Sequence, residues 1–162
     1  MCLYTCLGTL IFVLKMAMVS LPNIEPVTLS IILLAVVFGR KAIWAVLVYV
    51  ALELLVWGVN LWSICYLYIW PGLFVLACAL KKEKSAFVWA CIAALFGFAF
   101  GALCTPPQFL VGGWTAALSW WQAGLPFDFV HGAGNFILTL VLFLPMKNVL
   151  EKLCRNWGKK TE

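Results

Sequence analysis

Residues 126–135 read Pro-Phe-Asp-Phe-Val-His-Gly-Ala-Gly-Asn and lead directly into the apolar run Phe136–Leu144. The stretch holds the single histidine of the chain, together with an acid and an amide. On an α-helix, Asp128, His131 and Asn135 are spaced i, i+3 and i+7, so they share one face. We therefore expect a long apolar helix whose first turns carry a polar face. Inside a membrane such a face needs a protein partner or a cavity.

The composition predicts an integral membrane protein. Hydrophobic residues make up 65% of the 162-residue chain, charged residues make up 10%, and the mean hydropathy is +1.06. A soluble domain carries about a quarter charged residues. The formal net charge of +5 does not indicate nucleic-acid binding, because the basic residues stand between apolar runs, where they are typical of membrane orientation.

The apolar runs predict an all-α fold, with one domain over residues 1–162 that crosses the lipid bilayer six times. The second segment has about a dozen residues, or ~18 Å of helix, which is well short of a hydrocarbon layer of ~30 Å. Either the bilayer is thinned there or the preceding loop dips inward to complete the crossing. We expect transmembrane helices over residues 3–21, 27–38, 42–57, 62–80, 86–104 and 129–150, and irregular outer loops over 20–26 and 105–127, with a short helix over 116–123.

Two local features concern helix packing. Gly97 and Gly101 have the Gly-xxx-Gly spacing that lets two membrane helices approach closely. Pro71 predicts a kink in the fourth segment.

The basic residues orient the helices. The gaps after the second and fourth segments, together with the end of the sixth segment and the tail, contain ten of the eleven Lys and Arg residues. The exception is Lys15, which lies inside the first segment, and the other three gaps contain none. Because loops rich in Lys and Arg stay in the cytoplasm, we expect both termini there.

The seven cysteines form no recognisable site. None belongs to a C-x-x-C pair, and nearly all fall within apolar runs, where cysteine behaves as a small hydrophobe. One histidine is too few for a typical metal site, and no metalloprotease or serine-hydrolase motif is present. The sequence has no phosphate-binding loop either. We therefore expect no cofactor and no metal in this chain, and any ATP-driven transport would need an ATPase from another chain.

The predicted orientation gathers polar and aromatic residues at or near the outer ends of the segments. Ionisable groups at membrane depth are expensive and mark functional sites. Aromatic side chains with a few convergent polar groups are typical of ligand pockets. The candidate substrate-binding residues are Asn23, Glu25, Glu53, Trp57, Asn60, Trp62, Tyr66, Trp114, Trp121, Asp128, His131 and Asn135.

Most of these candidates also have a structural interpretation. Trp62 and the other tryptophans fit a membrane-interface belt. Glu25, between two prolines, fits a solvated loop acid. His131 can serve as a structural hydrogen-bonding partner of Asp128 or Asn135.

Glu53 is different, because it lies more than a turn inside an apolar helix. That position favours a functional role or a buried ion pair. Lys15 either pairs with it or extends its ammonium to the interface.

Three stretches resemble a known family of membrane proteins. They are residues 21–27 (Leu-Pro-Asn-Ile-Glu-Pro-Val), 63–71 (Ser-Ile-Cys-Tyr-Leu-Tyr-Ile-Trp-Pro) and 126–136 (Pro-Phe-Asp-Phe-Val-His-Gly-Ala-Gly-Asn-Phe). In this order they resemble the pattern of the substrate-binding S components of energy-coupling factor (ECF) transporters. The chain length and the predicted six crossings agree with the resemblance, which spans nearly the whole chain.

The resemblance implies a function in uptake. An S component captures a water-soluble vitamin or related micronutrient, with high affinity, at the outer face of a prokaryotic cell membrane. It associates with a transmembrane coupling protein and two cytoplasmic ATPases, which use the ATP. The resemblance implies that the S component then topples in the bilayer and releases its substrate inside the cell. The resemblance therefore implies a transport subunit that is not itself an enzyme.

The resemblance also points to the first helix as the contact with the coupling protein. Family members use an Ala-xxx-Ala pattern there. This chain lacks that alanine pair, and its nearest small-residue equivalents are Cys2, Thr5, Cys6 and Thr9. Small residues at this spacing let helices approach closely, whichever residue type supplies them.

Two other functions stand beside this one. The first is a small membrane-embedded enzyme that uses His131 and Asp128 as acid and base, and the second is a structural subunit without a ligand. If the chain is an S component, its aromatic candidates would supply stacking or cation–π contacts. The outer-side acids disfavour a strongly anionic substrate and favour a neutral or cationic one.

Overall fold

A computed structural model describes residues 2–20 and 24–158, so the candidate Asn23 lies outside the described residues. Throughout the described residues the fold is all-α, as the sequence predicts. A π-helical turn, η1 (Leu34–Phe38), extends the second helix, and a 3-10 turn, η2 (Arg40–Ala42), leads into the third. The helices of the first half are α1 (Cys2–Ala17), α2 (Val27–Leu33), α3 (Ile43–Trp57) and α4 (Leu61–Ala79).

The second half contains α5 (Ala86–Phe98), the short α6 (Phe100–Leu103) and the long α7 (Thr105–Gly158). The predicted irregular loop over 105–127 is wrong, because these residues are helical. Only Gly113, with φ 67° and ψ −164°, leaves the helical conformation, so two helices meet at a kink there. The predicted sixth helix over 129–150 is therefore the middle of a helix that begins after Gly113.

The prolines of this region explain how it can be helical. Pro106 and Pro107 lie in the first turn of α7. Backbone N–H groups in a first turn have no acceptor within the helix, so proline, which lacks this N–H, is tolerated there. Pro126 lies within α7, and prolines inside apolar helices are tolerated when neighbouring groups satisfy the freed carbonyl. Of the two adjacent glycines, Gly113 takes the left-handed φ that makes the kink.

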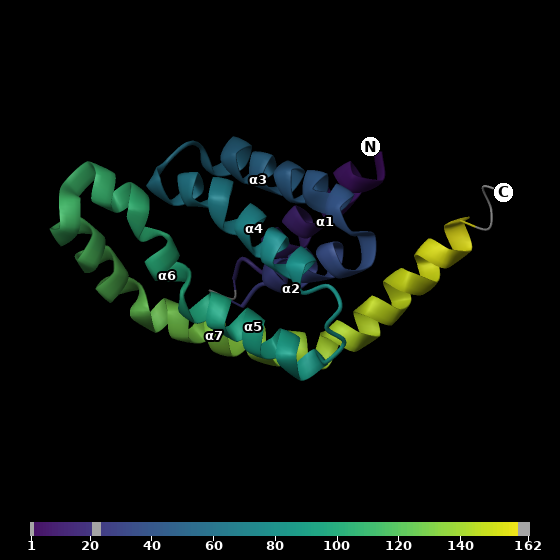
Figure 1. Ribbon diagram of the computed structural model, residues 1–162. Helices are drawn as coiled ribbons and strands as arrows, with labels where there is room; N and C mark the ends of the chain where they lie inside the picture. The colour runs from purple at the N-terminus through teal and green to yellow at the C-terminus, as the bar shows by residue number, and fades with distance from the viewer. Residues whose placement is uncertain (1, 21–23, 159–162) are drawn as a thin grey trace.

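The helices form two groups that pack against each other (Figure 1). One group contains α1 to α4, with α1 packed along α3, and the other contains α5 packed along α7. Both ends of the described chain and the link between α4 and α5 lie on the same side of the molecule, at the right of Figure 1. The link between α3 and α4 and the first turns of α7 lie on the opposite side.

Glycines allow the closest helix contacts. Backbone atoms of Gly132 in α7 lie 2.7 Å from the position that a Cβ on Gly97 would occupy, so any side chain at residue 97 would push α5 and α7 apart. A Cβ on Gly101 would meet the carboxylate of Asp128. The close approach that the Gly-xxx-Gly spacing predicts is confirmed at both glycines.

Helices α4 and α7 are long and apolar enough to span a membrane. The 19 residues of α4 correspond to about 28 Å, which matches a hydrocarbon layer of ~30 Å. The other apolar helices are shorter, with 16 residues in α1 and 13 in α5.

Helix α2 begins inside the molecule. Val27 and Thr28 are fully buried, and the Thr28 hydroxyl accepts a hydrogen bond of 3.1 Å from Nδ2 of Asn135, in the middle of α7. The first residues of α2 therefore lie in the interior of the molecule, against the middle of α7.

Candidate functional site

Three adjoining cavities of about 440, 220 and 330 Å³ meet at the side chain of Trp62, which lines all of them. We call the first the aromatic chamber; its walls are Trp62, Phe100, Gly101, Trp120, Ala123, Gly124, Phe127, Asp128 and His131. The other two share Lys15, Trp57, Trp62 and Tyr66, and together we call them the polar chamber. Glu25 lines the smaller part of the polar chamber and Glu53 the larger.

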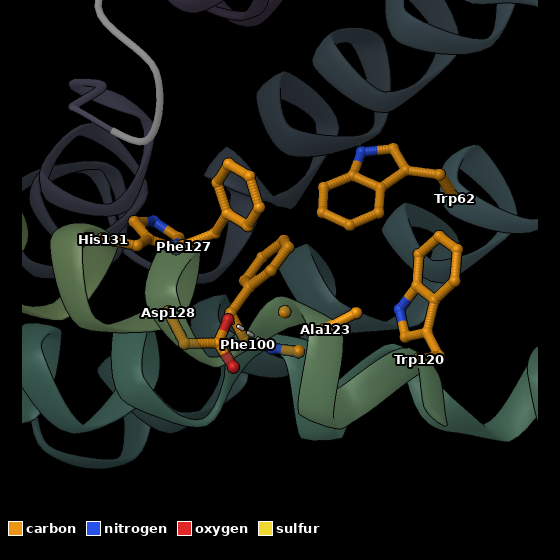
Figure 2. A pocket seen from close by; sticks show the side chains of 9 residues that line it. Trp62, Phe100, Trp120, Ala123, Phe127, Asp128 and His131 are labelled. Carbon is orange, nitrogen blue, oxygen red and sulfur yellow. Dashed lines mark hydrogen bonds between the residues drawn. The ribbon is translucent and has the colours of Figure 1, made fainter. Parts of the chain in front are cut away.

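Side chains from three helices build the aromatic chamber (Figure 2). Trp62 comes from the first turn of α4, Phe100 begins α6, and Trp120 and Phe127 come from α7. The ring centroid of Trp62 lies 5.7 Å from that of Phe100 and 6.1 Å from that of Trp120. Such spacing is typical of interacting aromatic pairs, so the three rings form a packed wall of the cavity.

Asp128 is fixed in this chamber by the break between α5 and α6. The N–H of Gly101 lies at the start of a new helix, where no earlier carbonyl accepts it. It donates instead to Oδ1 of Asp128, at 2.8 Å (Figure 2). The second oxygen, Oδ2, is buried and has no hydrogen-bond partner among the described residues.

His131 stands one turn further along α7. The residue is 3% exposed, and its ring packs in a T-shaped arrangement with the Phe100 ring at a centroid distance of 5.0 Å. Its Nε2 is buried and, within the part of the chain that the structure describes, has no partner. His131 and Asp128 form no hydrogen bond with each other in that part of the chain.

The polar chamber is organised by Lys15. Its ammonium pairs with Oε2 of Glu53 at 2.8 Å, donates to the Tyr66 hydroxyl at 3.3 Å, and lies 4.9 Å from the Tyr66 ring centroid. Nε1 of Trp62 also donates to the Tyr66 hydroxyl, at 3.1 Å. Of the two arrangements open to Lys15 from the sequence, the structure has the ion pair. The other oxygen of Glu53, Oε1, is buried without a partner among the described residues.

Glu25 is half-buried in the link before α2. It lines a cavity with Lys15, Tyr66 and His131. Burial raises the pKa of Glu25 above its usual value, against the opposing effect of the Lys15 ammonium. Glu25 is therefore a cavity acid rather than a solvated loop acid.

Two predicted candidates, Asn60 and Asn135, make structural contacts, and Asn60 also lines the larger part of the polar chamber. Oδ1 of Asn60 accepts from the N–H groups of Trp62 and Ser63, at 2.9 and 3.0 Å, and so caps α4. Nδ2 of Asn135 donates to Thr28 at 3.1 Å and to the carbonyl of Ala93 at 3.3 Å, which ties α7 to α2 and α5.

Trp114 and Trp121 are not brought into the chambers. Trp114 is 72% exposed and packs on Phe109, at a ring-centroid distance of 4.8 Å. Trp121 is 38% exposed and lines neither chamber.

Sequence reasoning missed three rings of the aromatic chamber: Phe100, Trp120 and Phe127. The spacing of two of these residues was a usable signal. Trp120 lies eight residues before Asp128, Phe127 lies one residue before it, and Gly124 lies between the two aromatic residues. Together with His131, these positions share one helical face. The expectation of a loop over 105–127 hid that face, and Phe100 lies in an apolar run without any distinguishing neighbour.

The small residues of α1 lie on its outer surface. Cys2, Thr5, Cys6 and Thr9 are exposed, whereas Gly8 packs against Ala45 and Val48 of α3. This face of α1 is therefore accessible in the isolated chain.

Comparisons with protein-family models, with curated proteins and with solved structures give no match.

Proposed function

We propose that this protein is the substrate-capture S component of an ECF-type importer for a water-soluble vitamin or related micronutrient. The observation that carries the proposal is that all three stretches of the family resemblance contribute side chains to one cavity system. Residues 21–27 contribute Glu25, residues 63–71 contribute Tyr66, and residues 126–136 contribute Phe127, Asp128 and His131. Stretches far apart in the sequence thus converge on one site.

The cavity system has the properties of a ligand site. Its largest part, about 440 Å³, lies within the usual range for small-molecule pockets. Aromatic rings form most of the walls, and Asp128, His131 and Glu53 each present a buried polar atom without a partner among the described residues. Buried polar atoms in proteins are normally satisfied, so such atoms beside a cavity suit a bound molecule.

The proposal includes six membrane crossings with both termini in the cytoplasm of a prokaryotic cell. Two observations support it: α4 and α7 are long and apolar enough to span, and both ends of the described part of the chain lie on one side of the molecule. The side with the α4–α5 link carries Lys81, Lys82 and Lys84 and would face the cytoplasm. The chambers lie near the link between α3 and α4, toward the opposite side.

The proposal also includes partners. The chain would capture its substrate from outside, and a transmembrane coupling protein with two cytoplasmic ATPases would drive release. The exposed face of α1 with Cys2, Thr5, Cys6 and Thr9 is the surface we assign to the coupling protein.

Gentle purification from cells tests this function. We expect a small molecule to co-purify with the chain and to be identified by mass spectrometry. We also expect two ATPases and a second membrane protein to co-purify in mild detergent. Replacement of Cys6 and Thr9 by Leu should remove these proteins and leave the small molecule bound. A preparation with neither a small molecule nor ATPases would overturn the proposal.

A further inference from the structure

We propose that the captured ligand is an organic cation with a planar apolar part. Its positive group would lie in the polar chamber beside Glu25 and Glu53, and its planar part would lie in the aromatic chamber against the ring of Trp62. This inference rests on the proposed function and names the chemical class of the substrate.

The charge of the chamber walls favours a cation. Three carboxylates line the two chambers, those of Glu25, Glu53 and Asp128, against the single ammonium of Lys15. An anionic ligand would be placed against like charges, which is a strong element of rejection. A cation would be placed among opposite ones.

The Lys15 ammonium already has partners within the chain. Its contacts are Glu53 at 2.8 Å, the Tyr66 hydroxyl at 3.3 Å and the face of the Tyr66 ring. To bind a ligand anion, Lys15 would have to leave Glu53 as an unpaired buried charge, which is costly. The one cation of the chambers is therefore a poor anion site.

Two buried carboxylate oxygens beside the chambers have no hydrogen-bond partner among the described residues, Oδ2 of Asp128 and Oε1 of Glu53. The Tyr49 hydroxyl lies beside the Glu53 carboxylate, so the acceptor without a neighbouring donor is Oδ2 of Asp128. Carboxylate oxygens accept hydrogen bonds and cannot donate them while ionised. A ligand with N–H groups satisfies them, and bonds between charged partners are the stronger ones.

The aromatic walls favour a ligand that has a planar apolar part. Trp62 lines both chambers, so one indole ring borders the polar group and the apolar part. Indole is the best natural face for a cation, and flat rings stack on Trp and Phe. The larger volume, about 440 Å³, belongs to the aromatic side and the smaller volumes, about 220 and 330 Å³, to the polar side.

Three probes that share the indole ring and differ in charge test the inference: tryptamine is a cation, indole is neutral and indole-3-acetate is an anion. Calorimetric titration of the full chain in detergent should give tryptamine an affinity at least about tenfold above that of indole. Indole-3-acetate should bind most weakly. Glu25→Gln should lower tryptamine affinity by about tenfold and leave that of indole unchanged. Glu83→Gln, in the α4–α5 link and away from the chambers, is the matched control and should change neither.

Asp128→Asn offers a second test of the total negative charge of the walls if Glu25→Gln does not fold: it should weaken tryptamine and leave indole unchanged, by less than about tenfold because Asp128 lines the chamber of the planar part. Stronger binding of indole or indole-3-acetate than of tryptamine would overturn the inference. A co-purified compound without a positive charge at neutral pH would also overturn it and would leave the proposed function standing. A chain that binds no small molecule at all would overturn both.

Discussion

The polar and aromatic chambers adjoin at Trp62 and each has a buried carboxylate oxygen without a partner among the described residues, but only the polar chamber has an ion pair between its walls. In the polar chamber, Lys15, Glu53 and Tyr66 bond to one another across α1, α3 and α4. In the aromatic chamber, Oδ2 of Asp128 and Nε2 of His131 have no partner within the described residues. The difference indicates that the polar chamber supports the fold as well as the ligand, whereas the aromatic chamber can be altered at little cost in stability.

The largest expected effect follows from Lys15→Met. The Glu53 side chain is only 3% exposed, so the substitution would leave a buried carboxylate without its counter-ion. Removing one partner of a buried ion pair costs about 3–5 kcal/mol. The free energy of unfolding in detergent micelles, followed by circular dichroism, measures the loss.

The double variant Lys15→Met with Glu53→Gln tests whether the ion pair is the cause. It should recover most of the lost stability, because no unpaired charge remains. Lys41→Met, at an exposed site, is the control and should unfold like the wild type. Equal stability of Lys15→Met and wild type would show that the polar chamber does not support the fold.

Neighbouring tryptophans test the aromatic chamber. Trp120 and Trp121 are equally exposed, at 37% and 38%, but only Trp120 lines the chamber. Trp120→Ala should weaken binding of the co-purified ligand by at least about tenfold, or ~1.4 kcal/mol. Trp121→Ala should change it by less than about threefold, and both variants should unfold alike. Equal losses of affinity in the two variants would show that the aromatic chamber is not the place where the ligand binds.

The pH dependence should separate binding from stability. Because burial raises the pKa of Glu25, this carboxyl takes up its proton at a higher pH than an exposed glutamate does. Affinity for a cation is therefore expected above that pKa and should be lost as the pH falls through it.

Stability of the ligand-free chain should change in the opposite direction. A carboxyl with a raised pKa in the folded state stabilises the fold at low pH, and the stability is lost as the pH rises through that pKa. Titrations and unfolding curves at several pH values measure both effects, and Glu25→Gln should flatten both. Facing Glu25, the charged and titratable groups are Lys15, Tyr49, Glu53, Tyr66 and His131. If Glu25→Gln leaves the pH profile unchanged, one of these five groups, and not Glu25, is responsible for the pH dependence.

The smallest expected effect concerns Asn60. Its side-chain oxygen caps α4, so Asn60→Ala should cost about 1 kcal/mol of stability, and Asn60→Asp should retain the cap. Ligand affinity should change little, since this oxygen is already occupied. Asn148→Ala, at an exposed position of α7, provides the control. A large loss of affinity in Asn60→Ala would instead make Asn60 a ligand contact.

The fold could be predicted from the sequence wherever an apolar run ends in charged or turn residues. Lys81 to Lys84 mark the end of α4, and Gly39 and Gly58 adopt the left-handed φ that closes the segments before them. The start of α7 could not be predicted in this way, because it contains the usual signs of a loop, Pro106, Pro107 and a Gly-Gly pair. Whether prolines begin a helix or interrupt it depends on which N–H groups the surrounding structure leaves unused.

The candidate site could be predicted where a residue type is unusual for its surroundings. Glu53 inside an apolar helix and the Asp128–His131 face both line the chambers. Asn60 and Asn135 are equally unusual for their surroundings in the sequence. In the structure, however, their side-chain amides form hydrogen bonds with backbone and side-chain groups of the protein itself. Phe100 could not be found, because its contribution depends on the break before α6 and a phenylalanine in an apolar run carries no signal.

Equilibrium binding of the co-purified compound to the isolated chain, without coupling or ATPase subunits, tests whether these chambers form a capture site. We expect one molecule per chain, bound tightly, recovered unchanged and lost in Trp120→Ala. Binding only after the ATPase subunits are added, or conversion of the compound to a product by the chain alone, would contradict capture by this subunit.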